Sequence, residues 1–114
     1  MIARLLPALA SAICAISVAL GAYASHVAAA PAKERLAVAA LFAFAHGLAL
    51  IMLAPRAAWL ARACQGFLLA GICLFSGSLA AAGLFGTSTA AAPLGGTLII
   101  FGWLLAAADY WRNP

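Results

Sequence analysis

Residues 36–55 read LAVAALFAFAHGLALIMLAP, a run of twenty residues without a charged side chain. A helix needs about 20 predominantly apolar residues to cross the hydrocarbon core of a bilayer, so this run predicts a transmembrane helix. The run closes at Pro55, and the residue before a proline is disfavoured in the helical conformation. We therefore expect a helix over residues 34–53.

Uncharged runs of the same kind lie on both sides of this segment. Residues 5–32 form one, and residues 63–108 form another that is long enough for two helices. Turn-type residues between Gly86 and Pro93 divide the longer run. The sequence thus predicts an all-α fold, an integral membrane four-helix bundle with short loops. The expected single domain has helices at residues 5–25, 34–53, 61–85 and 92–111, with Pro7 in the first turn of the first helix.

The composition excludes several classes of protein. The chain is 68% hydrophobic and 7% charged, whereas about a quarter of the residues in soluble domains are charged. Its net charge of +4 comes from basic residues scattered near helix ends, without a tract that could follow a phosphate backbone. Nucleic acid is therefore not an expected partner. The three cysteines form no pattern of zinc-ligand spacing, so no metal site is expected.

The basic residues also predict the orientation in the membrane. One side of the predicted bundle holds four arginines and the other holds Lys33 and Arg35; the four are Arg4, Arg56, Arg62 and Arg112. Since cytoplasmic loops carry the excess of Lys and Arg, both termini are expected in the cytoplasm, most naturally at a bacterial inner (plasma) membrane. The N-terminus also resembles a signal peptide with a small-x-small site at residues 22–24, but its apolar run is longer than the usual ~7–15 residues, which favours a retained helix.

Small residues are placed where helices could pack closely. In lipid, helices associate largely through small residues that let their backbones approach. The first helix carries such a stripe: Ala10, Cys14, Ser17, Gly21 and Ser25. Across the chain we expect seven residues at helix contacts: Gly21, Gly47, Gly77, Gly95, Gly96, Gly102 and Trp103. Trp103 is too deep for an interfacial anchor, so its indole N–H needs a partner within the bundle. The alternative is that so alanine-rich a chain shows such spacing by chance.

Five short segments resemble those of a known family: Gly21-Ala22-Tyr23-Ala24-Ser25-His26, Ala45-His46-Gly47-Leu48-Ala49-Leu50, Phe75-Ser76-Gly77-Ser78-Leu79, Pro93-Leu94-Gly95-Gly96 and Phe101-Gly102-Trp103-Leu104. In this order and spacing they are similar to the domain of unknown function 423 family of small membrane proteins, which includes YgdD-like and transmembrane protein 256-like proteins. The resemblance implies a four-helix membrane protein and weighs against signal cleavage. It implies no established activity.

The sequence lacks a pair of carboxylates that could act together in acid–base catalysis. Glu34 and Asp109 are the only two, and they belong to opposite sides of the membrane. Asp109 precedes Arg112 by three residues, the spacing of a weak helical ion pair, and both carboxylates are expected to be solvated. We therefore expect no catalytic residues, no enzyme activity and no cofactor.

His46 is the main candidate for a functional or structural polar site, because it falls near the middle of its predicted helix. Ionisable groups at that depth are rare and usually face the bundle interior. Ser76 and Ser78 are expected at similar depth, so a hydrogen bond from His46 to one of them, or to a backbone carbonyl of the third or fourth helix, is the structural interpretation. His26 lies about 15 Å higher by helical rise, too far to share a metal or haem with His46, and is expected to be an interfacial or loop-capping residue.

The sequence leaves three classes of function open, and the third, a cofactor-binding redox protein, rests only on two histidines at different depths. The leading hypothesis is a non-catalytic accessory, scaffold or assembly component, whose partners are the lipid bilayer and either another membrane protein or further copies of itself. The alternative is a small transporter or channel subunit that acts as an oligomer, with His46 in a polar mid-membrane site.

Overall fold

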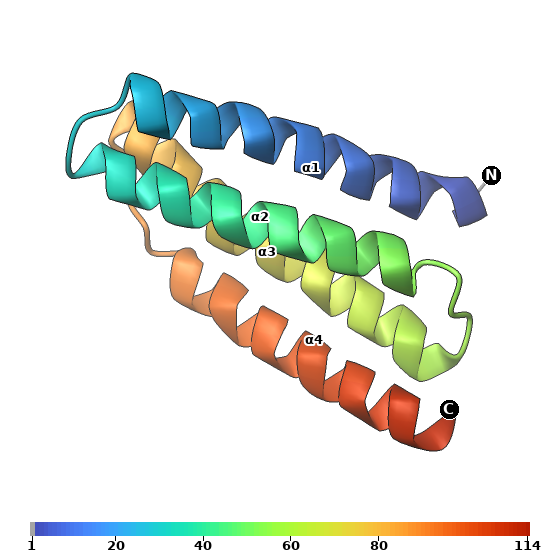
Figure 1. Cartoon of the computed structure of the whole chain (residues 1–114). Helices are drawn as coiled ribbons and strands as arrows, with labels where there is room; N and C mark the ends of the chain where they lie inside the picture. The colour runs from blue at the N-terminus through green and yellow to red at the C-terminus, as the bar shows by residue number, and fades with distance from the viewer. Residues whose placement is uncertain (1) are drawn as a thin grey trace.

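The computed structural model describes residues 2–114, except for the side chain of Ile2, and consists of four helices (Figure 1). They are α1 (Ile2–His26), α2 (Ala32–Leu53), α3 (Trp59–Phe85) and α4 (Ala92–Arg112). Each is long and apolar enough to cross a membrane. The predicted all-α fold is confirmed, and four such helices indicate an integral membrane protein.

The first helix differs from its expected bounds. It begins at Ile2 rather than near Leu5, so Pro7 lies inside the helix and not in its first turn. A proline at that position lacks the N–H that would bond to the carbonyl of Ala3. The cost is the loss of that one hydrogen bond, in the second turn of the helix.

The ends of the other helices follow from local chemistry. Pro93 stands in the first turn of α4, where its missing N–H costs nothing. Gly86 ends α3 with φ +71°, a left-handed conformation suited to glycine, and its N–H donates to the Ala82 carbonyl. Gln65 of α3 closes the end of α2, because its Nε2 donates to the carbonyls of Leu53 (2.7 Å) and Arg56 (3.1 Å).

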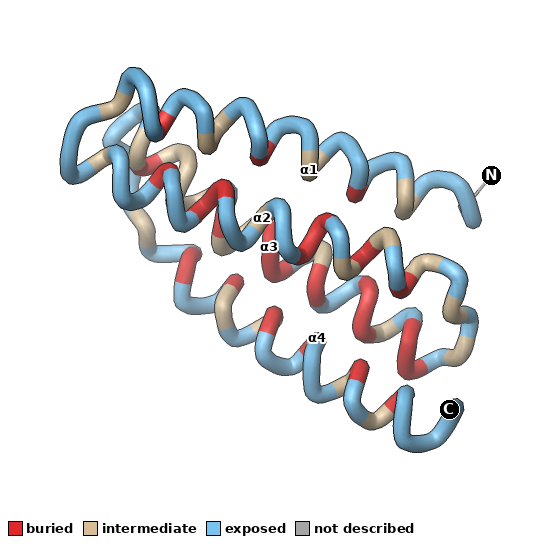
Figure 2. The backbone as a smooth tube through the Cα atoms, in the orientation of Figure 1, coloured by how far each residue is buried: buried red, intermediate tan, exposed pale blue. Residues whose placement is uncertain are grey.

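Over the described residues, the backbone of each helix packs only on its neighbours in the sequence, so the first and last helices do not close the bundle. Backbone contacts join α1 to α2, α2 to α3 and α3 to α4, whereas α1 approaches neither α3 nor α4 within 8 Å between Cα atoms over residues 2–114. Buried side chains accordingly gather on α2, α3 and α4, and most of α1 is exposed (Figure 2). Both chain ends lie at the same end of the bundle, which we call the terminal end (Figure 1).

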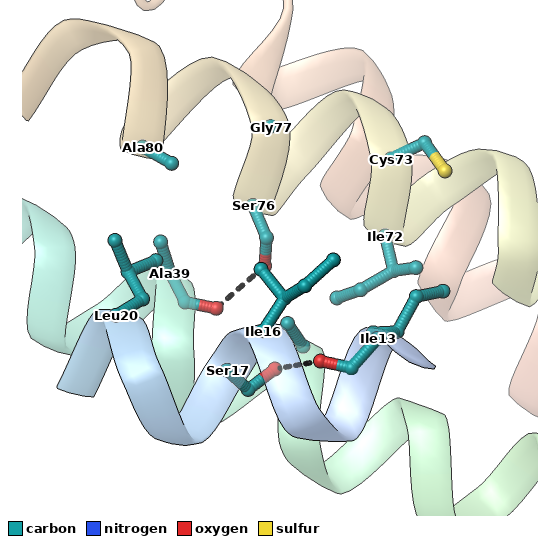
Figure 3. Close-up of a pocket in the computed structure, with 11 residues that line it drawn as sticks. Ile13, Ile16, Ser17, Leu20, Ala39, Ile72, Cys73, Ser76, Gly77 and Ala80 are labelled. Atoms are coloured by element: carbon teal, nitrogen blue, oxygen red, sulfur yellow. Dashed lines mark hydrogen bonds between the residues drawn. The ribbon is translucent and has the colours of Figure 1, made fainter. Parts of the chain in front are cut away.

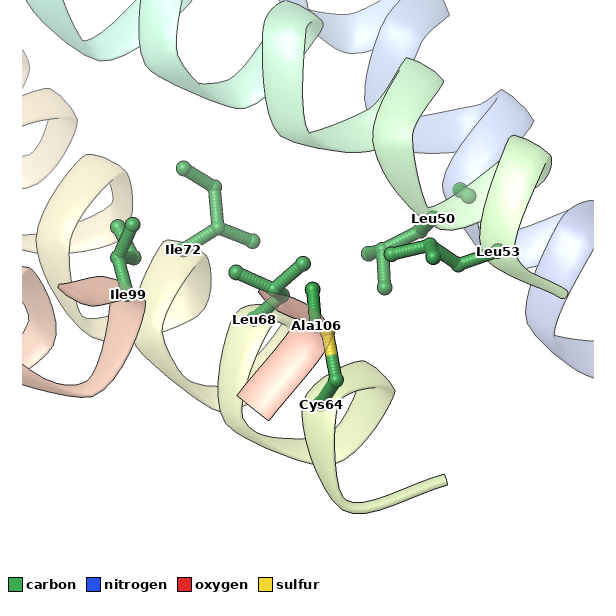
Figure 4. Packing of buried hydrophobic residues seen from close by; sticks show 8 residues of the cluster. Leu50, Leu53, Cys64, Leu68, Ile72, Ile99 and Ala106 are labelled. Carbon is green, nitrogen blue, oxygen red and sulfur yellow. The ribbon is translucent and has the colours of Figure 1, made fainter. Parts of the chain in front are cut away.

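The core is a chain of aliphatic side chains along α2, α3 and α4 (Figure 4). Leu50 and Leu53 of α2 face Leu68 and Ile72 of α3, which in turn meet Ile99 of α4. Since lipid tails are as apolar as this core, shape rather than hydrophobic burial decides how these helices assemble. The glycine contacts are therefore the more informative positions.

Glycines stand at the tightest crossings. A Cβ at Gly47 would lie 2.6 Å from the Cys14 sulfur and 3.1 Å from the Ala10 carbonyl oxygen. A Cβ at Gly95 would meet the Phe75 backbone nitrogen and lie 2.7 Å from the Gly71 carbonyl oxygen. Gly102 is close to the Leu68 side chain, while Gly21 and Gly96 make ordinary van der Waals contacts. Close packing of α1 on α2 and of α3 on α4 thus depends on the absence of these side chains.

Two expected packing positions are wrong. Gly77 has nothing within 4 Å of an added Cβ, so it is not at a helix contact within the chain. On α1 the buried residues are Ala10, Ser17 and Ala24, whereas Ser25 is exposed. Their spacing of seven residues is that of a narrow supercoiled seam, which continues to residue 24 and leaves residue 25 beside it.

Candidate polar site between α2 and α4

His46 lies in the second half of α2 and is 7% exposed. Its Nδ1 is 2.7 Å from the Phe42 carbonyl oxygen one turn earlier. A carbonyl oxygen can only accept, so Nδ1 carries the proton and donates. The ring is thereby fixed against its own helix, and its second nitrogen points away from it.

That second nitrogen is bonded to Trp103 of α4. The indole Nε1–H donates to His46 Nε2 over 3.1 Å, and an indole nitrogen is a donor only. Nε2 must therefore present its lone pair, which makes His46 a neutral imidazole protonated at Nδ1. The two rings meet at 60° with centroids 5.9 Å apart, and the Phe42 ring lies nearly parallel to the imidazole at 5.8 Å.

This hydrogen bond connects two helices whose backbones stay apart. Within the described residues, no Cα atom of α2 comes within 8 Å of one in α4. Trp103 is 45% exposed, so it bridges the gap from the surface of α4 while covering the edge of the imidazole. The expectation that the Trp103 N–H finds a partner inside the bundle is confirmed by this contact.

The expected partner of His46 is wrong. Ser76 is buried, but its hydroxyl donates to the Ala39 carbonyl of α2 over 2.9 Å. Ser78 faces the other end of the bundle, where its hydroxyl lies 3.5 Å from the Ser88 carbonyl oxygen. The rotation of α3 thus turns both serines away from the imidazole. Ser76 instead ties α2 to α3 through a backbone carbonyl.

His26 takes no part in this site. It is the last residue of α1 and is exposed, as expected for an interfacial histidine. Among residues 2–114, no group of three or more His, Cys, Asp or Glu side chains is placed to hold a metal ion.

A second polar cluster lies at the terminal end and was not predicted. Asp109 is 1% exposed, and its Oδ2 accepts a hydrogen bond from Arg56 Nε over 2.6 Å. Asn113 donates to its other oxygen over 3.0 Å, and the guanidinium of Arg56 also covers the Tyr110 ring at 4.2 Å. The expected pairing of Asp109 with Arg112 in solvent is therefore wrong. Glu34 is exposed, as expected.

The signal that could have revealed this cluster is the charge count. The terminal end holds four arginines and one side-chain carboxylate, that of Asp109. A carboxylate at the end of an apolar helix can be buried only if a charged partner accompanies it. Only the helix arrangement identifies Arg56, rather than Arg62 or Arg112, as the partner of Asp109, because Arg56 lies 53 positions from Asp109 in the sequence.

Comparison with known proteins identifies the family. A family model described as "Protein of unknown function (DUF423)" matches residues 20–96, more than half of the chain. The chain belongs to the DUF423 family. Comparison with curated proteins and with solved structures finds no match.

The matched part of this DUF423 protein includes His46, Ser76 and the Gly95-Gly96 pair but ends before Trp103. The family resemblance inferred from the five sequence segments is thus confirmed, and the last of them, Phe101–Leu104, lies outside the match. Within the matched range, each of three motifs supplies one helix contact: Gly47 against α1, Ser76 against α2, and Gly95 against α3.

The hydrogen bonds of the polar site determine what His46 can do chemically. Both nitrogens of His46 are engaged in this DUF423 protein, and every enclosed side-chain N or O atom in the described residues has a hydrogen-bond partner. Protonation of Nε2 would replace the Trp103 hydrogen bond by two opposed donors. The arrangement is that of a structural contact that holds α4 against α2.

Proposed function

We propose that this protein is a non-catalytic accessory or scaffold component of the membrane, and that it binds a helix of a partner membrane protein between α1 and α3. The observation that carries the proposal is the open face left by α1, which packs on α2 alone. Helix α3 also packs on α2, and residues of all three helices line a groove between α1 and α3 with α2 as its floor.

The α1–α3 groove is a cavity of about 170 Å³ lined by three helices (Figure 3). Its lining comprises Ile13, Ile16, Ser17, Leu20, Ala39, Ala43, Ile72, Cys73, Ser76, Gly77 and Ala80. Ile16 and Leu20 of α1 point across it toward α3, and Ile72 and Ser76 of α3 point toward α1 (Figure 3). Seven of the eleven are alanine, glycine, serine or cysteine, the residue types that let a further helix backbone approach closely in lipid.

The chemistry of the groove favours a helix over a polar ligand. Its two hydroxyl groups are already used, since Ser17 donates to the Ile13 carbonyl over 2.7 Å and Ser76 to that of Ala39 over 2.9 Å. Gly77, where an added Cβ would meet nothing within 4 Å, lines this groove. A partner helix would supply the packing contact that this glycine lacks, and alanine or glycine in that helix would fit best.

The charge distribution supports one orientation. Arg4, Arg56, Arg62 and Arg112 belong to the terminal end, against Lys33 and Arg35 at the other end. By the excess of basic residues in cytoplasmic segments, we place both termini in the cytoplasm and the protein in a bacterial inner membrane. The alternative role as a transporter subunit finds less support, because the groove is not lined by His46 and both nitrogens of that imidazole are bonded.

The test uses two glycines of α3 that both have open space around them. Gly77 lines the groove and Gly66 does not, and an added Cβ meets nothing within 4 Å at either position. Gly77→Phe should fill the groove and abolish co-purification of a partner in mild detergent, whereas Gly66→Phe should retain it at equal thermal stability. Equal retention by both variants would contradict the proposal. A self-oligomer that conducts ions in liposomes would establish the transporter alternative instead.

A further inference from the structure

A second cavity lies at the terminal end, where α1, the end of α2 and the start of α3 meet. It measures about 420 Å³, and its walls include Leu6, Pro7 and Ile51 together with Arg62 and Gln65. It forms for the same reason as the α1–α3 groove, because α1 does not close onto α3. We call it the terminal pocket. It combines an apolar wall with a charged mouth at the level of a membrane–water boundary.

Arg62 brings an unbalanced positive charge to this pocket. Its side chain is exposed, and within residues 2–114 the one ion pair joins Arg56 to Asp109. Asp109 is the only carboxylate side chain at this end and is fully engaged, because Glu34 belongs to the opposite end. No side-chain anion of the protein is thus left to neutralise Arg62. A negative group at this depth has to come from outside, and the phosphate of a lipid is the anion that every bilayer places there.

Gln65 adds a hydrogen-bond acceptor of fixed direction. It is 5% exposed, and its Nε2 donates to the carbonyls of Leu53 and Arg56. Since carbonyls cannot donate, the amide cannot be flipped, and Oε1 is the atom left to face elsewhere. It has no protein donor among the described residues and is not fully enclosed, because every enclosed side-chain polar atom there is bonded. The pocket that Gln65 lines therefore offers an acceptor beside the Arg62 donors.

We propose that the terminal pocket binds the head group of an anionic glycerophospholipid, with the phosphodiester on Arg62 and a head-group hydroxyl donating to Gln65 Oε1. Leu6, Pro7 and Ile51 contact the glycerol and the first carbons of the acyl chains. Phosphatidylglycerol has both required groups, a phosphate and hydroxyl donors. The excess of arginine at this end selects an anionic lipid over a zwitterionic one.

The test separates this pocket from general attraction between arginine and anionic lipid. Arg112 is the matched control, because it is also exposed and belongs to the same end but does not line the pocket. In purified full-length protein, lipid binding is measured by native mass spectrometry and by thermal stabilisation with added phosphatidylglycerol, phosphatidylcholine or inorganic phosphate. Arg62→Gln should weaken phosphatidylglycerol binding roughly tenfold, as expected for loss of a charge-assisted hydrogen bond, and Arg112→Gln less than about twofold.

A second variant keeps every charge. Ala3 is exposed and lines the pocket, so Ala3→Trp should fill it and weaken phosphatidylglycerol binding while Arg62 remains in place. This variant also decides the question if Arg62→Gln fails to fold. Equal losses in Arg62→Gln and Arg112→Gln, or no loss in Ala3→Trp, would overturn the proposal. Stabilisation by inorganic phosphate as strong as that by phosphatidylglycerol would overturn the lipid as the source of the anion.

Discussion

Trp103 donates its indole N–H to Nε2 of His46 across 3.1 Å and so joins α4 to α2, two helices whose Cα atoms stay more than 8 Å apart throughout the described residues. The bond fixes the imidazole as a neutral acceptor, since Nδ1–H is committed to the Phe42 carbonyl. The most conspicuous polar residue within a transmembrane helix is thereby explained as a structural contact between helices.

Substitutions of His46 distinguish a structural from a chemical role. His46→Gln can still accept from Trp103 and should largely preserve folding, whereas His46→Leu leaves the indole N–H without a partner and should cost about 1 kcal/mol. The free energy of unfolding in bicelles or detergent measures both. Trp103→Phe is the control, because it removes the same hydrogen bond and should add nothing further to His46→Leu. Loss of function in a stable His46→Gln protein would instead indicate a proton relay.

The Arg56–Asp109 pair should dominate stability at the terminal end. Asp109→Ala leaves a partly buried guanidinium without its carboxylate and should cost about 3 kcal/mol of unfolding free energy. Glu34→Gln removes an exposed carboxylate and should leave stability unchanged. Comparable melting temperatures for the two variants would show that the ion pair does not hold α4 in place.

Hydropathy and turn residues predicted the four helices well, because the length of an apolar run and the position of a proline are local properties of the chain. The ends of α2 and α3 at Leu53 and Phe85 fall at the expected residues, and α1 deviates where Pro7 is tolerated inside the helix. Gly47, Gly95 and Gly102 lie at helix contacts, as small residues in lipid-embedded helices were expected to do.

Partners across helices were predicted poorly, because they depend on the rotation and order of the helices. The sequence indicates that His46 and Trp103 each need a hydrogen-bond partner. It favours the serines of α3 as partners of His46 only because they lie at a similar depth in the membrane, and the structure pairs His46 with Trp103 instead. Gly77 was assigned to packing from its position among small residues, but α1 stops short of α3 and leaves that face open. Asp109 looked solvated because its partner comes from the distant loop between α2 and α3.

The crossing of α3 and α4 should tolerate no side chain at Gly95. An added Cβ would strike the Phe75 backbone nitrogen and the Gly71 carbonyl, and backbone atoms cannot rotate aside as a side chain can. Gly95→Ala should therefore destabilise the protein by about 1–3 kcal/mol, the usual cost of overpacking. Gly77→Ala, with open space around it, should be neutral in the same unfolding measurement. A neutral Gly95→Ala would contradict the close crossing.

The orientation of the bundle can be measured with reporters. Both termini lie at the same end, which also holds the larger number of arginines (Figure 1). Tags at the two termini should therefore both report the cytoplasm, and a tag in the loop between α1 and α2 should report the opposite side. Charge reversal at Arg56 or Arg62 tests whether the basic residues cause this orientation. A smaller excess of arginine at the terminal end should give a mixture of the two orientations. Termini on opposite sides would be incompatible with four spans.

The open groove between α1 and α3 is the central claim about function, and a photo-cross-link in intact membranes tests it most directly. A photoreactive phenylalanine analogue at Cys73, which is exposed and lines the groove, is compared with the same residue at Ala70, which is exposed on α3 outside the groove. We predict a protein adduct of one defined mass from Cys73 and none from Ala70. Adducts with lipid alone at both positions would show that no partner helix occupies the groove.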